Sequence, residues 1–408
     1  MGKPGKAGRP ACNFQRRQIK KGKPVLSFNL GSSSLKFALF LMGEKEKLLA
    51  RGEVERIGAP GGRFRMSDAE NRVLEDAQGD FPEHLIAVKA VFSALEKLDL
   101  PRPRAVGHRV VHGGAEHSHP AIIDRGLLVE LKKLIPFAPL HLPYEIRCME
   151  AVAGHFPEIP QVACFDTAFH RRMPEIAQRF PLPGDLWDDG VRRYGFHGLS
   201  YEYILSVLGA RARGRVIMAH LGNGASMAAV KNGRPMDTTM GFSPTGGFMM
   251  GTRSGDLDPG ILIYLMAEKG YDAGRIEHLV NHQAGLLGVS GISADMKTLL
   301  DSRRDDPRAA LAVDMFCYHL RRQAGALAAV LGGIDTFVFT GGIGERAAAV
   351  RRDVCRGLDH LGIYIDSHSN KIHAPVISRP AGPCTVMVIP ANEDLMIARH
   401  TFRLLSGE

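Results

Sequence analysis

Residues 25–41 read VLSFNLGSSSLKFALFL, and this stretch sets the pattern for the rest of the chain. Two short apolar runs rich in strand-forming residues flank a small polar turn, so the segment is predicted to form a strand, a tight turn and a second strand. Gly31 lets the backbone approach a ligand closely, and the hydroxyls of Ser32, Ser33 and Ser34 with nearby N–H groups are suited to cradle a phosphate. On this stretch alone, an ordinary hairpin with a serine turn explains the pattern equally well.

The same pattern returns near the middle of the chain, where residues 215–230 read RVIMAHLGNGASMAAV. Laid over the first stretch, Leu221-Gly222 falls on Leu30-Gly31, and the turn Asn223-Gly224 falls on Ser32-Ser33. The offset is nearly half of the 408 residues, whereas solenoid repeats have periods of ~20–50 residues. Strands alternate with helices elsewhere in the chain, which indicates an α/β architecture. We therefore expect a duplicated α/β domain, with a nucleotide held in a cleft between the two copies.

The net charge of +9 is concentrated at the start of the chain. Residues 1–24 hold eight lysines and arginines and no acidic residue, so the remaining chain is nearly neutral and shows no nucleic-acid footprint. This tail has few apolar residues and is expected to be disordered; a nucleic-acid partner would rest on the tail alone. No run approaches the ~18 apolar residues of a membrane span. Six cysteines without CxxC spacing, and no secretory signal, favour a reducing cytoplasm.

Several segments gather polar side chains and glycines beyond what folding requires. Taken singly, each has an ordinary explanation, because loop arginines are usually solvated, lone histidines usually belong to the core, and carboxylates at helix starts are caps. Together, these residue types are what phosphoryl transfer uses to position and neutralise a moving phosphoryl group. The segments are GHRVVHGG at 107–114, CFDTAFH at 164–170, RRYGFHG at 192–198, MGTRSGDLDPG at 250–260, TGGIGE at 340–345 and ANED at 391–394.

These segments, with NLGSSSLKF at 29–37, APLH at 138–141 and HLGNGAS at 220–226, resemble the acetate kinase family in kind and order. The resemblance covers residues 25–405, nearly the whole chain. It implies the fold of acetate and sugar kinases, Hsp70 and actin, in which two duplicated ribonuclease H-like α/β domains surround a nucleotide cleft. It also implies reversible phosphoryl transfer from ATP to a short-chain carboxylate, giving an acyl phosphate and ADP, and a homodimer.

The resemblance also implies domain limits. After a basic tail at 1–24, the first domain is expected at 25–168 together with 391–408, and the second at 169–390. The first would supply the carboxylate and phosphate side, and the second the nucleotide side.

Four catalytic and substrate-binding roles carry over by motif. Arg109 would bind the substrate carboxylate, while His197 and Arg253 would stabilise the transferring phosphoryl group. Asp166 would be the active-site acid/base or an orienting group. This set is physically coherent, because a carboxylate is already ionised at neutral pH and needs cations beside the phosphoryl oxygens more than it needs a base.

The other positions carried over by the resemblance are ligands of the metal, the nucleotide and the alkyl end of the substrate. The metal would be Mg²⁺, with Mn²⁺ as the alternative, and the nucleotide ATP or ADP. They are Asn29 and Glu393 for the metal; Lys36, His220, Leu221, Gly222, Asn223, Gly224, Asp295, Met296, Lys297, Gly342, Ile343, Gly344, Glu345 and Arg346 for the nucleotide; and Val111, Leu140, Phe196 and Pro244 for the alkyl pocket.

The chain departs from the family pattern at a few positions. Lys297 stands where the family usually has Arg, and Arg346 where it usually has Asn. Leu142, Leu199 and Tyr201 also differ. These departures bear on nucleotide contacts and on the choice of acid, and they leave the chemistry in place.

Two alternative functions accompany the acetate kinase hypothesis. The nearer one is a kinase of the same fold that acts on propionate or another short acid. The other is a non-catalytic, nucleotide-dependent interaction protein. Such a protein would not need Arg109, His197 and Arg253 beside an acid pocket, so the sequence favours the enzyme.

Overall fold

The computed structural model describes residues 22–31, 33–380 and 382–407, which form two compact units. The first unit comprises the chain up to His112, His119–Phe165 and the chain from Glu393 onward, and the second comprises Gly113–Ser118 and Asp166–Asn392. Most of the basic tail expected at 1–24 lies outside the described residues. Lys23 and Pro24, at the end of that segment, pair with Met42 and Leu41 of the neighbouring strand.

The first unit is built on an eight-stranded mixed sheet in the order β5-β4-β3-β2-β1-β6-β8-β7. Strands β1 and β2 form the antiparallel hairpin predicted from the serine turn, and β1, β6 and β8 run parallel. The strands are β1 (Lys23–Leu30), β2 (Ser34–Met42), β3 (Lys47–Glu55), β4 (Gly62–Asp68), β5 (Val73–Gly79), β6 (Ala105–Val110), β7 (Ala121–Ile122) and β8 (Gln161–Phe165); the helices are α2 (His84–Lys97), α3 (Arg125–Lys133), α4 (Leu142–His155) and α16 (Glu393–Ser406).

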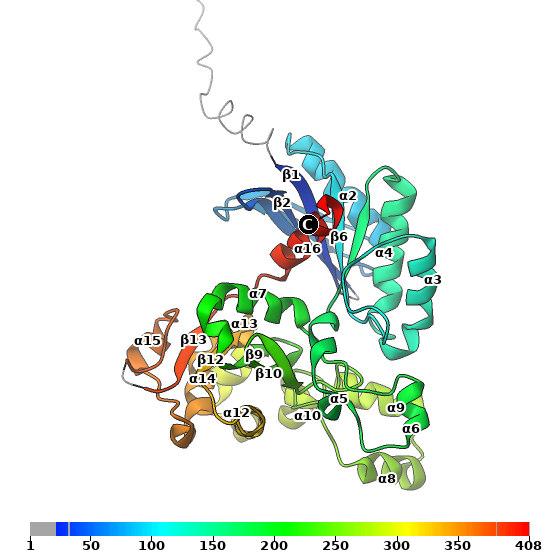
Figure 1. The fold of residues 1–408 in the computed structure, drawn as a ribbon. Helices are drawn as coiled ribbons and strands as arrows, with labels where there is room; N and C mark the ends of the chain where they lie inside the picture. The colour runs from blue at the N-terminus through cyan, green and yellow to red at the C-terminus, as the bar shows by residue number, and fades with distance from the viewer. Residues whose placement is uncertain (1–21, 32, 381, 408) are drawn as a thin grey trace, which may run out of the picture. The chain divides into compact units, whose positions relative to one another are not determined.

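Side chains of β1 alternate between two hydrophobic clusters. Leu26, Phe28 and Leu30 belong to the larger cluster, which includes buried residues of α2 and α4. Val25 belongs to a smaller cluster with Ala398 of α16, and α16 lies along β1 and β6 (Figure 1). Because successive strand side chains point to opposite faces, the polar residues of β1 that alternate with the larger cluster point toward α16.

Gly107 of β6 allows α16 to pack closely. A Cβ at this position would lie 2.6 Å from Ile397 Cγ2 and would also collide with the Thr401 hydroxyl. Helix α16 therefore packs on β6 over a residue without a side chain, at the level of Ile397 and Thr401.

The second unit is built on a five-stranded mixed sheet in the order β11-β10-β9-β12-β13. The echo of the first hairpin is confirmed, because β9 and β10 are antiparallel and Gly222 N donates to Gly224 O at 3.1 Å. The strands are β9 (Arg215–Leu221), β10 (Ala225–Lys231), β11 (Arg234–Thr238), β12 (Thr336–Thr340) and β13 (Thr385–Val388).

The likeness between the two units extends from the hairpins to the sheets. The order β11-β10-β9-β12-β13 repeats the order β3-β2-β1-β6-β8 of the first unit. In each run, two antiparallel pairings are followed by two parallel ones. The expected α/β fold class is thereby confirmed.

Helix α7 (Gly198–Leu208) packs on one face of the second sheet. Met218 of β9 and Ala228 of β10 form a cluster with Tyr201 and Ile204 of this helix. His220 lies two residues after Met218 and Ser226 two residues before Ala228, so both point to the same face, toward α7. They stand directly opposite each other in the β9–β10 register.

The remaining helices of the second unit include one that corrects the sequence prediction. The sequence predicts that GGIGER at 341–346 is a turn and that a helix begins at about Ala347. In the structure, these six residues form helix α13 directly after β12. The helices are α5 (Glu175–Gln178), α6 (Gly184–Asp188), α8 (Pro259–Lys269), α9 (Ala273–His278), α10 (Gly285–Ser290), α11 (Met296–Ser302), α12 (Pro307–Leu331), α13 (Gly341–Arg346), α14 (Ala348–Cys355) and α15 (Ser367–Lys371). Within the described part of the chain, no helix is long and apolar enough to cross a bilayer.

Candidate active site

The α16 face of the first unit carries a cluster of oxygen-bearing side chains. The Asn29 amide donates from Nδ2 to Glu393 Oε2 at 3.0 Å, and the Ser27 hydroxyl lies 3.3 Å from Asp394 Oδ1. Burial, followed by the charge of Glu393, raises the pKa of the Asp394 carboxyl to about 6. Lys36 stands across from Asn29 in the β1–β2 pair, with an exposed side chain. Two adjacent carboxyl groups thus meet an amide N–H group and a hydroxyl, and Lys36 is a nearby cation.

The serine turn between β1 and β2 is compact. Gly31 N donates to Ser34 O at 2.9 Å, and a Cβ at Gly31 would lie 2.9 Å from Ser34 Oγ. His84 Nε2 lies 3.4 Å from Gly31 O on the other side of the turn. Ser33 is exposed, whereas Ser32 lies outside the described residues. The geometry suits a close backbone approach to a ligand, and the phosphate role stays a prediction.

Arg109 is positioned by a buried carboxylate that the sequence did not single out. Glu145, in the first turn of α4, has a side chain 1% exposed, and its Oε1 lies 4.0 Å from Arg109 Nη1. Its Oε2 accepts the backbone N–H of Val111 at 3.0 Å. One carboxylate therefore orients both the guanidinium group and the backbone of two predicted substrate-binding residues.

Asp166 holds the backbone at the start of α7. Its Oδ2 accepts the His197 N–H at 3.1 Å, and its Oδ1 accepts the Leu199 N–H at 3.3 Å. His197 has a left-handed backbone with φ of 58°, which is uncommon for a residue with a side chain. Of the two predicted roles for Asp166, this geometry supports the orienting one, because both carboxylate oxygens are engaged with backbone that fixes His197.

His197 and Arg253 converge on the turn of the second hairpin. A Cβ at Gly224 would lie 3.3 Å from Arg253 Nη1 and 3.6 Å from His197 Nε2. The imidazole rings of His197 and His220 stack, with centroids 4.2 Å apart and planes inclined by 15°. Two predicted catalytic residues and the predicted nucleotide loop 220–224 are therefore brought together in the second unit, over a residue that has no side chain.

The Gly-rich helix α13 is fixed from within the protein. Glu345 Oε1 accepts the N–H of Gly341 at 3.0 Å and that of Ala391 at 2.9 Å. The buried Arg351 donates from Nη1 to the carbonyls of Gly344 at 2.8 Å and Glu345 at 2.9 Å. The Glu345 side chain is thus engaged in holding two backbone segments, while Gly342 and Arg346 are exposed at the helix surface.

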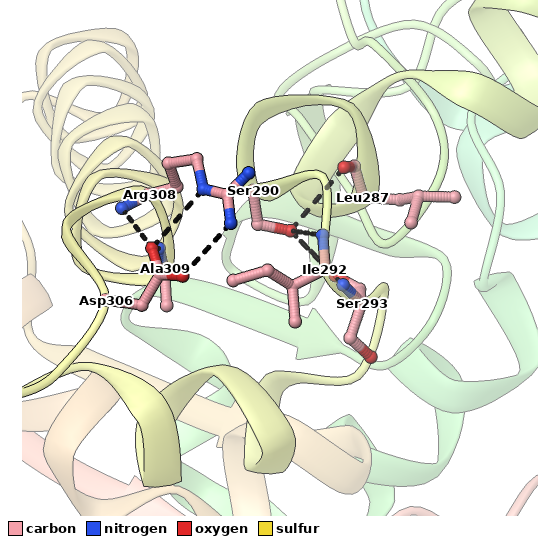
Figure 2. A network of polar contacts seen from close by, with 7 residues as sticks. All are labelled: Leu287, Ser290, Ile292, Ser293, Asp306, Arg308 and Ala309. Atoms are coloured by element: carbon pink, nitrogen blue, oxygen red, sulfur yellow. Dashed lines mark hydrogen bonds and ion pairs between the residues drawn. The ribbon is translucent and has the colours of Figure 1, made fainter.

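A serine stabilises the loop that precedes α11. Ser290 Oγ accepts the N–H of Ile292 at 3.1 Å and that of Ser293 at 3.3 Å, as Figure 2 shows. Next to this loop, Asp306 caps the long helix α12 by accepting the Arg308 N–H at 2.7 Å (Figure 2). The loop therefore leads in a defined conformation to the predicted nucleotide contacts Asp295, Met296 and Lys297.

Those three residues point to different environments. Asp295 caps α11 by accepting the N–H and the hydroxyl of Thr298, each at 2.9 Å, and these hydrogen bonds lower the pKa of its carboxyl. Met296 is buried, whereas Lys297 has a side chain 87% exposed and lies 3.6 Å from Asp301. Only Asp295 and Lys297 are thus placed where a ligand could reach them.

Comparison with known proteins identifies the family. Residues 24–399 match the model of the acetokinase family. The chain belongs to the acetokinase family. It is 46% identical over 396 residues to an acetate kinase of Rhodopseudomonas palustris, covering 94% of this chain and 98% of that protein. As a member of this family it is an ATP-binding phosphotransferase with acetate kinase activity.

Solved structures agree with this assignment. The crystal structure of Porphyromonas gingivalis acetate kinase matches with a TM-score of 0.85 at 41% identity, over 94% of this chain and 100% of that chain. A propionate kinase from Francisella tularensis matches with a TM-score of 0.88 at 35% identity, over 93% of this chain and 99% of that chain. The predicted fold of the acetokinase family is confirmed.

The four predicted alkyl-pocket residues are divided between the units. Val111 is buried and Leu140 is half-buried in the first unit. In the second unit, the Phe196 carbonyl accepts from His170 Nε2 at 2.9 Å, and the Pro244 carbonyl accepts from Arg253 Nη1 at 3.3 Å. The backbone carbonyls of Phe196 and Pro244 are therefore each hydrogen-bonded to the side chain of another residue in the quoted motifs, His170 and Arg253 respectively.

Sequence reasoning missed several residues that hold the site together. Glu145, Asp394, Ser226 and Arg351 all contact predicted site residues. Asp394 carried a signal, since it stands beside Glu393 in the quoted motif. Ser226 also lay in a quoted motif, HLGNGAS at 220–226, whereas Glu145 and Arg351 lie in helices outside every quoted motif and carried no local signal.

Asp166→Asn tests whether Asp166 orients the site. The amide presents one acceptor and one donor to two backbone N–H groups, so one of them loses its partner. We expect a loss of about 1–3 kcal/mol in unfolding free energy, measured by denaturant titration, together with a fall in kcat. Asp124→Asn is the control, because Asp124 caps α3 through one N–H and asparagine also caps helices well. A large loss of kcat with unchanged stability would instead indicate direct proton transfer by Asp166.

Proposed function

We propose that the protein transfers the γ-phosphoryl group of ATP to acetate through Arg109, His197 and Arg253. The observation that carries the proposal is the convergence of His197 Nε2 and Arg253 Nη1 on Gly224, in the loop that also carries the nucleotide motif. Two hydrogen-bond donors at one bare backbone position suit phosphoryl oxygens. Arg109, whose side chain is 13% exposed, takes the acetate carboxylate, because the buried Glu145 orients its guanidinium group.

The reaction needs no general base. The acetate oxygen attacks the γ-phosphorus while the bond to the ADP oxygen breaks, and no proton moves because the carboxylate is ionised at neutral pH. Charge accumulates on the equatorial phosphoryl oxygens, where Arg253 and His197 donate. Asp166 acts as a positioning residue, since it holds His197 by the backbone. The reverse reaction uses the same groups.

The α16 face of the first unit suits a divalent cation. Asn29, Glu393 and Asp394 offer the amide and carboxylate oxygens that Mg²⁺ prefers, and the pKa of Asp394 is raised first by burial and then by the charge of Glu393, which a cation would offset. We assign Asn29 and Glu393 to Mg²⁺, with Mn²⁺ as the alternative. When bound, the cation neutralises phosphate charge on the nucleotide.

Glu393→Gln tests this metal assignment. Glutamine keeps the shape and can still accept from Asn29, but it removes the charge. We expect the rise in melting temperature caused by Mg²⁺ alone to shrink, and the Mg²⁺ concentration for half-maximal rate to increase by about tenfold or more. Glu46→Gln removes an exposed carboxylate of the same unit that pairs with Arg399, and should leave both values unchanged. Wild-type Mg²⁺ behaviour in Glu393→Gln would reject the assignment.

Arg253→Ala tests the role in phosphoryl transfer. Its effect belongs to the transition state, so kcat should fall on the order of 10³-fold or more, with a modest change in the KM of acetate and with ATP binding retained. Arg253→Lys should recover only part of the kcat that is lost in Arg253→Ala, because an ammonium group lacks the planar fork of donors. Hydroxamate detection of acyl phosphate measures kcat, and exposed Arg304→Ala is the charge-matched control. A near-normal kcat in Arg253→Ala would contradict the mechanism.

Propionate is the alternative acid, and Val111 is the residue that tests the choice. The side chain is 1% exposed and follows the strand that carries Arg109. If Val111 limits the alkyl end, Val111→Ala should improve propionate over acetate in kcat/KM by about 1–3 kcal/mol at most, which is 10- to 200-fold. The comparison of formate, acetate, propionate and butyrate gives the preference directly. An unchanged ratio would place the alkyl pocket elsewhere.

We also propose a homodimer in which α8 contacts a second copy of the chain. Six consecutive apolar residues occupy 261–266, yet α8 has no buried residue, and Ile263 is 66% exposed. An eleven-residue helix is marginal alone in water, where isolated helices need ~12–15 residues. An apolar face of this kind marks an interface, and the same face on two copies is self-complementary in a twofold dimer.

Ile263→Glu tests the dimer. A charge in the middle of the apolar face should convert a dimer into a monomer, as light scattering coupled to size-exclusion chromatography would record. Val129→Glu makes the same change at an exposed apolar residue of α3 and should leave the mass unchanged. A wild-type protein that is monomeric, or an Ile263→Glu variant that stays dimeric, would reject α8 as the interface.

A further inference from the structure

A buried chain of hydroxyl groups leads from α7 to the imidazole of His197. Tyr201 Oη lies 2.5 Å from Ser226 Oγ, and Ser226 Oγ lies 2.8 Å from His197 Nδ1. Tyr201 and Ser226 are both 0% exposed. Tyr201 lies one turn after His197 and donates its N–H to the His197 carbonyl at 3.1 Å, which places both side chains on the same side of α7.

The two nitrogens of His197 therefore face different surroundings. Nδ1 meets the buried Ser226 hydroxyl, whereas Nε2 faces Gly224 and the Arg253 guanidinium. Other titratable groups near the ring include His220 of β9, which stacks on it, and Asp166, which accepts its backbone N–H. The groups that bear on the protonation of His197 therefore include the hydroxyl chain, the stacked imidazole, the Arg253 guanidinium and the Asp166 carboxylate.

The hydroxyl chain has a preferred direction. Either hydroxyl could be the donor, and because a phenol is a stronger donor than an aliphatic hydroxyl, donation from Tyr201 to Ser226 Oγ is favoured. Ser226 has a single proton, which is then directed to His197 Nδ1. A ring that accepts at Nδ1 carries its proton at Nε2.

We infer that Tyr201 is a positioning residue which, through Ser226, holds the His197 imidazole neutral with its proton on Nε2. In this state Nε2–H is a donor aimed at the position shared with Arg253, so His197 contributes a hydrogen bond to the phosphoryl group and Arg253 contributes the charge. The inference rests on the proposed role of His197 for its catalytic consequence, and on geometry alone for the tautomer. Tyr201 is one of the positions at which this chain departs from the family pattern.

Tyr201→Phe is the decisive variant, because it removes one oxygen and keeps the ring. The imidazole nitrogens of the free protein, labelled with ¹⁵N-histidine, report the tautomer by NMR. We expect the Nε2-protonated form to dominate in the wild type. Its population should fall in Tyr201→Phe, where Ser226 is free to accept from Nδ1–H. The acidic limb of the kcat profile should move to higher pH, because the protonated ring is easier to form.

The size of the effect is bounded by a known case. A wrong histidine tautomer costs a serine protease about 10⁴-fold in kcat. Because Tyr201→Phe retains Ser226, we expect kcat of this variant to fall by only about tenfold near pH 6. The KM of acetate should change little, since Tyr201 does not touch the acid in the proposed mechanism. Ser226→Ala breaks the same chain at its next member and should reproduce both the tautomer change and the shifted profile.

Tyr194→Phe is the matched control. Tyr194 is also buried in the second unit, and its hydroxyl donates to the Gly190 carbonyl at 2.8 Å, outside the chain that reaches His197. It should lose comparable stability, compared by melting temperature, without a change in tautomer or pH profile. A wild-type tautomer in both Tyr201→Phe and Ser226→Ala, or the same shift in Tyr194→Phe, would overturn the inference. A changed tautomer with an unchanged pH profile would support the relay and reject the catalytic role of His197 instead.

Discussion

The functional side chains of both units depend on the alternation of side chains along three short strands. In β1 the residues facing the larger core alternate with Ser27 and Asn29, which therefore meet the first residues of α16. In β9 and β10 the same alternation turns His220 and Ser226 toward α7. Because a one-residue slip would send each of these side chains into the opposite face, the hydrophobic pattern that folds the sheets also fixes the polar groups.

Backbone contacts made by buried polar side chains give the site its second layer of order. Asp166 holds the start of α7, Glu345 holds the start of α13, and Glu145 holds the residue after β6. A buried N–H left without a partner costs about 1–3 kcal/mol, so each carboxylate specifies one loop conformation. These three acidic residues therefore fix the backbone conformation of the site, whatever part they have in the chemistry.

The sequence was sufficient for the features that repeat or that carry a local pattern. Both hairpins and the α/β class follow from residue type and spacing, whereas the shared role of the segments that converge at Gly224 was implied by the resemblance to the acetate kinase family. The contacts that depend on distant partners did not follow: nothing local links Glu145 to Arg109 or Ser226 to Tyr201, because packing brings these pairs together. The helical form of 341–346 was also missed, since glycines favour a turn locally while the carbonyl contacts of Arg351 favour a helix.

Arg351 has a consequence for recombination between related proteins. Its guanidinium joins the carbonyls of Gly344 and Glu345 to Asn370, which it contacts at both the side-chain and backbone oxygens at 2.8 Å. A chimera with a crossover between positions 351 and 370 would combine a guanidinium from one parent with acceptors from another. Segments 341–351 and 366–373 should therefore be exchanged as a single block, although the first spans α13 and the start of α14 and the second contains the short helix α15.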